Sequence, residues 1–342
     1  MTKDSTNRQE RTAQRSEPVA QPTGFGRTAR ILLGMVIAAG LIAAVFRIGD
    51  LRHFLDLARH AQPAWLLGAA GLQVGTYVAL ALGWQAVLRR ADAPIPMKRL
   101  MPLALAKLFA DQAIPSAGVG GNILLVDRLM ALGVPRGAAM ATLLISMVGF
   151  YASYAVLSIA MLMVLWLHGR ATPLMVGLVT SFLLVALAIP SLALWLRARG
   201  SRPLPQRVER LGPIRDLVHA IGDAPRSLVR NRSLIVRVAI FNGLVFLADS
   251  LTLACCLAAL GQPAAAGAAF VALMAASVVV TLGPIPLGLG SFEATATAML
   301  HALGVPVEAA ITATLMLRGF TLWLPLIPGG LLLRQAVRRK AR

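Results

Sequence analysis

The sequence contains few charged side chains for its length. Only 14% of its 342 residues are Asp, Glu, Lys or Arg, whereas 57% are hydrophobic, and the mean hydropathy is +0.73. A soluble domain of this size cannot bury so much apolar surface inside itself. The composition therefore excludes a soluble protein and predicts an integral membrane protein.

Residues that would build a disulfide framework, a metal centre or a nucleotide site are also scarce. Cys255 and Cys256 are adjacent, so they cannot cross-link separate elements, and the five histidines lack the paired spacing of metal ligands. The glycine-rich segments 118–122 and 288–292 do not follow a strand of a βαβ unit, which argues against a nucleotide cradle. The sequence thus implies no metal and no cofactor.

What the sequence does contain is a series of apolar blocks. A spanning helix needs about 20 such residues, and we expect six full spans, at 31–46, 63–88, 137–167, 173–196, 238–260 and 307–333. The block at 31–46 is short and follows a basic segment, so a cleaved signal peptide is an alternative for it. The expected fold is an all-α helical bundle in the membrane.

Two further apolar stretches, 100–133 and 264–303, are each broken near the middle by Gly, Pro and a polar side chain. Proline removes a backbone donor, and lipid cannot satisfy the groups left unpaired, so the breaks must face protein or water. The arm 291–303 would be about 20 Å long as a helix, too short for a core of about 30 Å. We expect two re-entrant hairpins, although the arm 264–282 is long enough to span fully.

The two broken stretches belong to an internal repeat. Residues 114–150 and 285–321 align without a gap at eleven of 37 positions, with "IP" and "GVP" at the same distance in both. Three full spans separate the copies, around 100–167 and 264–333, so the second is inverted relative to the first, as in many transporters. The break residues are Pro115, Gly118, Gly120, Gly121, Pro286, Gly288 and Gly290.

The net charge of +19 comes from Lys and Arg gathered in particular loops. Six lie before residue 31, four in 89–99, ten in 197–237 and five after 333. The positive-inside rule then places both termini in the cytoplasm of a cell with an inner membrane, and nucleic-acid binding is not implied. We expect a disordered basic tail at 1–30, a basic tail at 334–342, and a basic loop at 197–237 that either binds anionic lipid head groups or is simply solvated.

One segment resembles a known family. The pattern Pro286, Gly288, Gly290, Ser291, Phe292 and Glu293, then "LGVP" at 303–306 and "RGFTLWLP" at 318–325, is similar to the lysylphosphatidylglycerol synthase transmembrane region, or flippase-like domain family. The resemblance implies a multi-span bundle with re-entrant elements, associated with moving lipids between leaflets. In the synthases a soluble aminoacyl-transfer domain follows this region. Here nine residues follow the last apolar block, so we expect the chain to act without that domain.

Ionisable groups at membrane depth are the candidate site residues. Glu293 begins a helical arm, where a carboxylate suits the helix start, and Arg318 lies near the middle of the last block. Arg318 either pairs with Glu293 structurally or binds a lipid phosphate through its planar fork.

Four other polar residues complete the expected substrate path. Lys107 and Asp111 are one helical turn apart and form a natural pair, and Asn122 replaces the charged residue often seen in the first copy. Asp249 lies within an apolar span, so it needs an internal partner, a proton or water. It either couples transport to protons or is a neutral, hydrogen-bonded structural acid.

Together these features favour a transporter rather than an enzyme. The expected function is translocation of a phospholipid, modified phospholipid or hopanoid-type lipid between leaflets, by a chain that acts alone or as a homo-oligomer. A membrane-embedded lipid-modifying enzyme and a scaffold of a lipid-synthesis machine remain alternatives.

Overall fold

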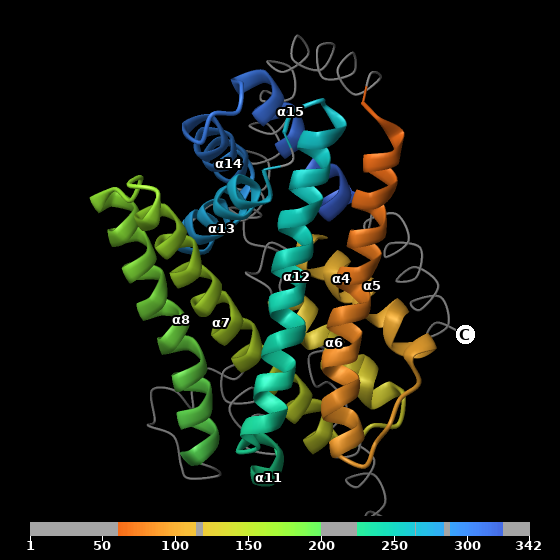
Figure 1. Ribbon diagram of the computed structural model, residues 1–342. Coiled ribbons are helices and arrows are strands. Elements are labelled where there is room, and N and C mark those ends of the chain that lie inside the picture. Colours follow the sequence, from red (N-terminus) through yellow and green to blue (C-terminus); the bar gives the residue numbers. More distant parts are fainter. Residues whose placement is uncertain (1–60, 114–118, 200–223, 264, 284–287, 324–342) are drawn as a thin grey trace, which may run out of the picture. The chain divides into compact units, whose positions relative to one another are not determined.

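A computed structural model describes residues 61–113, 119–199, 224–263, 265–283 and 288–323, and within these ranges all regular structure is helical (Figure 1). The chain divides into two compact units, 1–56 and 57–342, and the described residues all belong to the second. The block expected to span at 31–46, both tails and most of the basic loop lie outside the described residues.

Four described helices are long and apolar enough to cross a membrane. They are α4 (Pro63–Arg90), α7 (Arg136–Leu167), α8 (Pro173–Arg199, apolar to Trp195) and α12 (Arg232–Ala259). Helices are therefore confirmed at four of the places where spans were expected, and the protein is an integral membrane protein. The span expected from residue 238 begins earlier, at Arg232, because the side chain of Asn231 accepts a hydrogen bond from the Leu234 N–H and caps the helix there.

Helix α12 is the element against which most others pack. It contacts α4 along much of its length, and also α7, α13 (Ala266–Leu282) and α15 (Val307–Arg318) (Figure 1). The approach of α7 is close, because a Cβ on Gly149 would lie only 2.9 Å from Val238 Cγ1. Small residues allow such contact where no water is available to drive helices together.

Two pairs of shorter helices pack against these spans. Helix α5 (Met97–Ala113) packs against α6 (Val119–Ala131), and α13 packs against α14 (Ser291–Ala302). With 17 and 12 residues, α13 and α14 are about 26 Å and 18 Å long. Each pair leads through a short turn into the next helix, α7 or α15, and α15 continues as the π-helix η2 (Gly319–Trp323).

The turns that follow the two pairs have the same backbone structure. Gly133 and Gly304 both adopt positive φ, at 87° and 99°, a conformation that favours glycine. Pro135 and Pro306 precede the next helices with φ of −57° and −55°. The backbone hydrogen bonds also correspond, as in Val134 to Leu129 at 3.1 Å and Val305 to Leu300 at 3.0 Å. The sequence repeat is therefore also a repeat of local structure.

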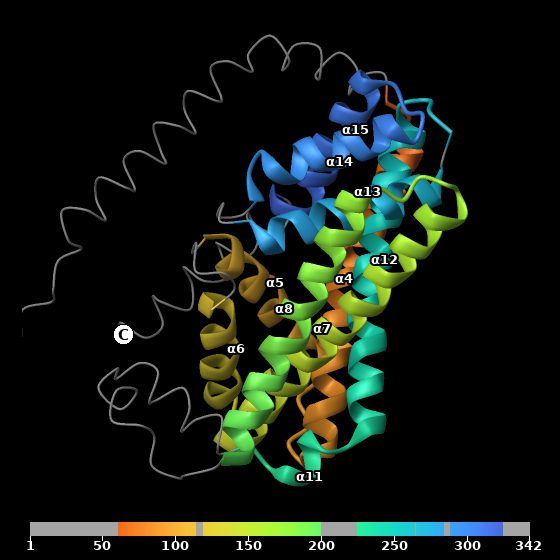
Figure 2. The same ribbon diagram turned by 90° about the vertical axis from the view of Figure 1, so that its left-hand side faces the viewer.

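The two turns lie at opposite ends of α7. The first, 132–135, leads directly into the start of this helix, which has 32 residues and is about 48 Å long. The second, 303–306, lies beyond the other end, because Arg170, just after α7, donates a hydrogen bond to the carbonyl of Ala302 at the end of α14. Figure 2 shows the two turns far apart along α7.

Candidate functional site

The turn that begins α14 requires glycine at residue 288. Gly288 adopts a φ of +61°, and a Cβ there would lie 2.4 Å from Val280 Cγ2 on α13. Both the conformation and the space exclude a side chain. Gly290 also has positive φ, at +85°, but a Cβ there would meet no atom within 4 Å. The break therefore folds tightly back against α13 at Gly288.

Glu293 lies in the first turn of α14 and caps the helix start. Its Oε2 accepts a hydrogen bond from the Gly290 N–H at 2.7 Å. The first amides of a helix have no partner within the helix, and the helix dipole favours a negative charge at this end. The position expected for Glu293 from the sequence is confirmed.

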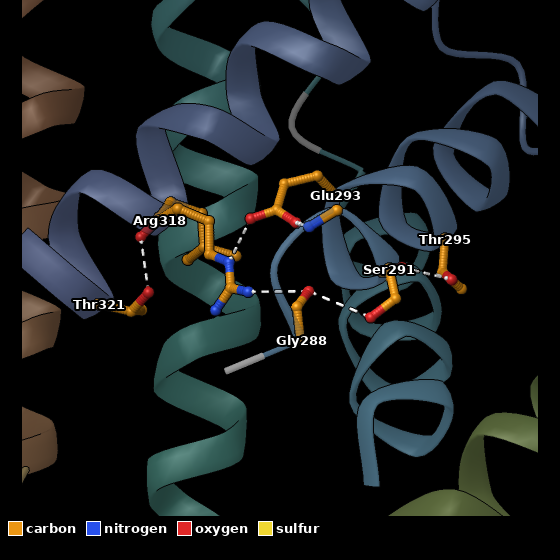
Figure 3. A network of polar contacts seen from close by, with 8 residues as sticks. Gly288, Ser291, Glu293, Thr295, Arg318 and Thr321 are labelled. Atoms are coloured by element: carbon orange, nitrogen blue, oxygen red, sulfur yellow. Dashed lines mark hydrogen bonds and ion pairs between the residues drawn. The ribbon is translucent and has the colours of Figure 1, made fainter. Parts of the chain in front are cut away.

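Arg318, the last residue of α15, brings the second charge to this turn (Figure 3). Its Nε donates to Glu293 Oε1 at 2.8 Å, and its Nη2 lies 3.4 Å from the Gly288 carbonyl oxygen. Its guanidinium carbon stands 4.3 Å from the centre of the Phe292 ring, within cation–π range. Residues Gly288, Gly290, Phe292, Glu293 and Arg318 form what we call the Arg318 network.

The Arg318 network is shielded but still reachable. The side chains of Glu293 and Arg318 are each 12% exposed, so their attraction is screened less than that of a surface pair. The arginine side chain is held by a carboxylate and an aromatic face at once, which fixes the orientation of its planar fork. The π-helix η2 begins immediately after Arg318, and such segments are frequent at functional sites.

The depth of the Arg318 network follows from helix lengths. Arg318 ends and Glu293 begins 12-residue helices that meet at the 303–306 turn. Each helix is about 18 Å long, roughly half or more of a bilayer core of about 30 Å. In a bilayer whose surface lies at that turn, the ion pair would be well inside the core.

Asp249 belongs to a second polar site, between α4 and α12. Gln73 Nε2 donates to Asp249 Oδ1 at 2.8 Å and lies 3.1 Å from Thr252 Oγ1. Tyr77, one turn after Gln73, is close enough to Asp249 to interact with it electrostatically. Its buried hydroxyl has no hydrogen-bond partner among the described residues. We call these four residues the Asp249 cluster.

The structure separates the remaining expected site residues from both groups or leaves them outside the description. Lys107 is half-buried on α5, and Asn122 is half-buried on α6. Asp111 lies on α5, but its side chain is outside the described residues. Gly120 and Gly121 fall within the first turn of α6. The break residues Pro115, Gly118 and Pro286 lie outside the described residues. In the described part no three His, Cys, Asp or Glu side chains group as metal ligands.

Sequence reasoning missed several members of both polar groups. Gln73 and Thr252 are fully buried polar residues in apolar spans, with 2% and 0% exposure, and this polarity was a signal that could have found them. Phe292 was part of the family pattern, but its contact with Arg318 follows only from the fold. Nothing in the sequence indicates that Tyr77 lies beside Asp249.

Comparison with known proteins identifies the family of this chain. No curated protein matches the chain. The family described as the lysylphosphatidylglycerol synthase TM region matches residues 31–329, which include all the described helices. A match over most of the chain establishes the relationship, and the chain belongs to the lysylphosphatidylglycerol synthase TM region family.

Proposed function

We propose that this protein moves a lipid between the leaflets of the inner membrane, and that the Arg318 network receives the lipid head group. The observation that carries the proposal is the Glu293–Arg318 pair at 2.8 Å, with each side chain 12% exposed, and we place this pair well inside the membrane. A charged pair at this depth is expensive unless it has a task. Membership of a family whose synthases act on lipids supports the same direction.

The architecture that we propose around this site is an inverted repeat. The pairs α5–α6 and α13–α14 end in the same turn, and the two turns lie at opposite ends of α7. Because α14 is too short to cross the membrane, we propose that each pair enters and leaves on one side. Six spans, two re-entrant hairpins and cytoplasmic termini then form two halves that expose the network alternately to each leaflet.

The chemistry of the exchange is simple. Arg318 offers a planar fork of donors that matches a phosphate diester. As phosphate takes the place of Glu293 Oε1, Glu293 keeps its hydrogen bond from the Gly290 N–H through Oε2. The arginine is neutralised before, during and after passage, while the lipid tail remains in the bilayer.

Arg318→Lys is the sharpest test, because it keeps the charge and removes the planar fork. The full chain is reconstituted in vesicles containing phosphatidylglycerol with a fluorescent head group, and bleaching from outside reports its movement between leaflets. In vesicles with the parent protein, we expect labelled lipid of the inner leaflet to reach the outer leaflet and be bleached. With Arg318→Lys, the rate of this movement should be at least about tenfold lower. Arg170→Lys, a matched change at an exposed arginine, should behave like the parent.

Three outcomes would contradict the proposal. Equal rates for Arg318→Lys and the parent would remove the head-group role of Arg318. A chemically altered lipid in the extracted vesicles would indicate the enzyme. The lipids that co-purify with the protein are identified by mass spectrometry and tested in the same vesicles. If neither these lipids nor phosphatidylglycerol move between leaflets, the scaffold is favoured.

A further inference from the structure

The Asp249 cluster lies deep in the membrane on the two helices that pack most extensively. Asp249 is about 15 Å from the end of α12 at Ala259, and Gln73 is about 15 Å from the start of α4 at Pro63. Both therefore lie near the centre of a core of about 30 Å. A carboxyl group at this depth is a functional candidate that the Arg318 network does not use.

The hydrogen bonds of the cluster have a defined direction. Thr252 donates its hydroxyl proton to the Ala248 carbonyl at 2.8 Å, so its oxygen accepts from Gln73. Gln73 thus directs one N–H to Thr252 and the other to Asp249 Oδ1. The cluster supplies one neutral donor to one carboxyl oxygen, which leaves the second oxygen available for a proton.

No cation among the described residues compensates the Asp249 charge. The ion pair described in this part of the chain joins Arg318 to Glu293, and no Lys, Arg or His of the described helices is within ion-pair distance of Asp249. The helices packed against α12 contribute these titratable or charged groups: Tyr77, Arg89 and Arg90 from α4, Arg226 from α11 (Arg226–Val229), Arg136, Tyr151 and Tyr154 from α7, Glu308 and Arg318 from α15, and none from α13. Of these groups, Tyr77 is the one that belongs to the Asp249 cluster.

The cluster can accommodate both protonation states of its acid. Gln73 donates to Oδ1, and the carbonyl oxygen of a carboxylic acid that is protonated on its second oxygen still accepts this hydrogen bond. Tyr77 is only 6% exposed, and its hydroxyl lacks a hydrogen-bond partner among the described residues. Such an unpaired donor at a buried site calls for a reason, and it lies close enough to the carboxyl group of Asp249 to respond to its charge.

The cluster is also mechanically connected to the Arg318 network. Helix α12, which carries Asp249, packs against α15, and α4, which carries Gln73, packs against η2 immediately after Arg318. A change in how α4 and α12 meet is therefore transmitted to the helix that holds the head-group arginine.

We propose that Asp249 is a proton-binding site that couples lipid movement to proton transfer across the membrane. The inference rests on the proposed lipid movement. An aqueous proton forms an O–H bond at the second oxygen of Asp249 when the site opens to one side, and this bond breaks with release of the proton when it opens to the other. No oxidation is involved: the proton that binds on one side is the proton released on the other, and the lipid phosphate carries its own negative charge.

The first experiment tests proton binding alone, without transport. Infrared difference spectra of the purified full chain are recorded while pH is changed from about 5 to about 8, and the carbonyl stretch of a protonated carboxylic acid is followed. We expect a titrating band that disappears in Asp249→Asn and persists in Asp127→Asn, a matched change at an exposed acid on α6. A band unchanged in Asp249→Asn would overturn the proposal.

The second experiment tests coupling, in the vesicles described above. We expect the rate of phosphatidylglycerol movement by the parent and Asp127→Asn to change up to about tenfold per pH unit, as control by one proton requires. Asp249→Asn should be independent of pH. A parent that moves lipid at one rate at every pH would overturn the coupling but leave the lipid movement standing, whereas a parent that moves no lipid would refute the proposed function.

If Asp249→Asn does not fold, Gln73→Ala keeps the test decisive. It removes the fixed donor to Oδ1 without removing the acid, so the infrared band should persist and titrate at a different pH. A band that titrates as in the parent would show that the acid responsible is not Asp249.

Discussion

The two helix pairs, α5–α6 and α13–α14, end in the same turn, yet their chemistry differs. At the repeat offset, Glu293 of the second copy corresponds to Asn122, and Arg318 corresponds to Met147. The second copy therefore holds a charged pair where the first holds an amide and a thioether. The backbone of the repeat is common to both copies, whereas the charged site belongs to one.

The difference extends to the break itself. Gly288, which touches Val280 and has positive φ, corresponds to Ala117 in the first copy, and Phe292, which covers the Arg318 guanidinium, corresponds to Gly121. The residues that shape and shield the ion pair are thus replaced together with the pair. The two segments share a turn, and a few side chains decide which of them carries the charged pair.

The largest expected effect is all-or-none labelling of the two turns. Single cysteines replace Pro135 and Pro306, which are equivalent and exposed, in a chain whose Cys255 and Cys256 are serine. We expect a membrane-impermeant thiol reagent added to intact cells to label position 306 and not 135, because the Lys and Arg distribution places 135 in the cytoplasm. Labelling of both from one side would contradict the inverted arrangement.

Converting the second copy to the residues of the first should nearly abolish lipid movement. In Glu293→Asn with Arg318→Met we expect the rate of lipid movement to fall roughly 100-fold. This change corresponds to the loss of two charge-assisted hydrogen bonds of about 1.5 kcal/mol each. The vesicle assay measures this rate. Stability in detergent should stay near the parent's, because both charges leave together.

The single change Arg318→Met separates stability from function at the same site. It leaves Glu293 without its cation and should lower the free energy of unfolding by about 1–3 kcal/mol, whereas Asn122→Ala in the first copy should change it by no more than about 0.5 kcal/mol. Denaturant titrations in detergent compare the free energies of unfolding of these two variants.

If the double variant Glu293→Asn with Arg318→Met moves lipid at the parental rate, the charged pair of the second copy has no special role in lipid movement.

The last prediction concerns the shape of the break. Gly288→Ala should lower the free energy of unfolding by about 2–4 kcal/mol, of which about 1 is the positive φ and the rest the overlap with Val280. Gly290→Ala, with positive φ but no atom nearby, should lose only about 1 kcal/mol. Thermal unfolding in detergent distinguishes the two, and equal losses would mean that Gly288 does not closely approach α13.

Much of the helix pattern was predictable, because crossing a bilayer imposes a length and an apolar composition on each segment. The block expected at 63–88 is α4 at Pro63–Arg90, and the one at 137–167 is α7 at Arg136–Leu167. Helix starts were harder to place where a cap decides them, as Asn231 does for α12. The blocks at 31–46 and beyond residue 323 stay predictions.

The candidate site was only half visible in the sequence. Glu293 and Arg318 stood out because charges are rare in apolar blocks, but their pairing was one of two alternatives, and the structure shows the pair in place. Whether that pair also binds a lipid phosphate stays a prediction. The roles expected for Lys107, Asp111 and Asn122 likewise stay predictions.

By itself, the sequence determined the membrane setting, the positions of the long helices and the family, because each is written in local composition or in a pattern of residues along the chain. Only the tertiary structure decided that Gln73 meets Asp249 at 2.8 Å, that Val280 lies against Gly288 and that Phe292 covers Arg318. These contacts depend on how neighbouring helices are rotated and shifted against one another. Packing of side chains sets that geometry, and no periodicity along the chain encodes it.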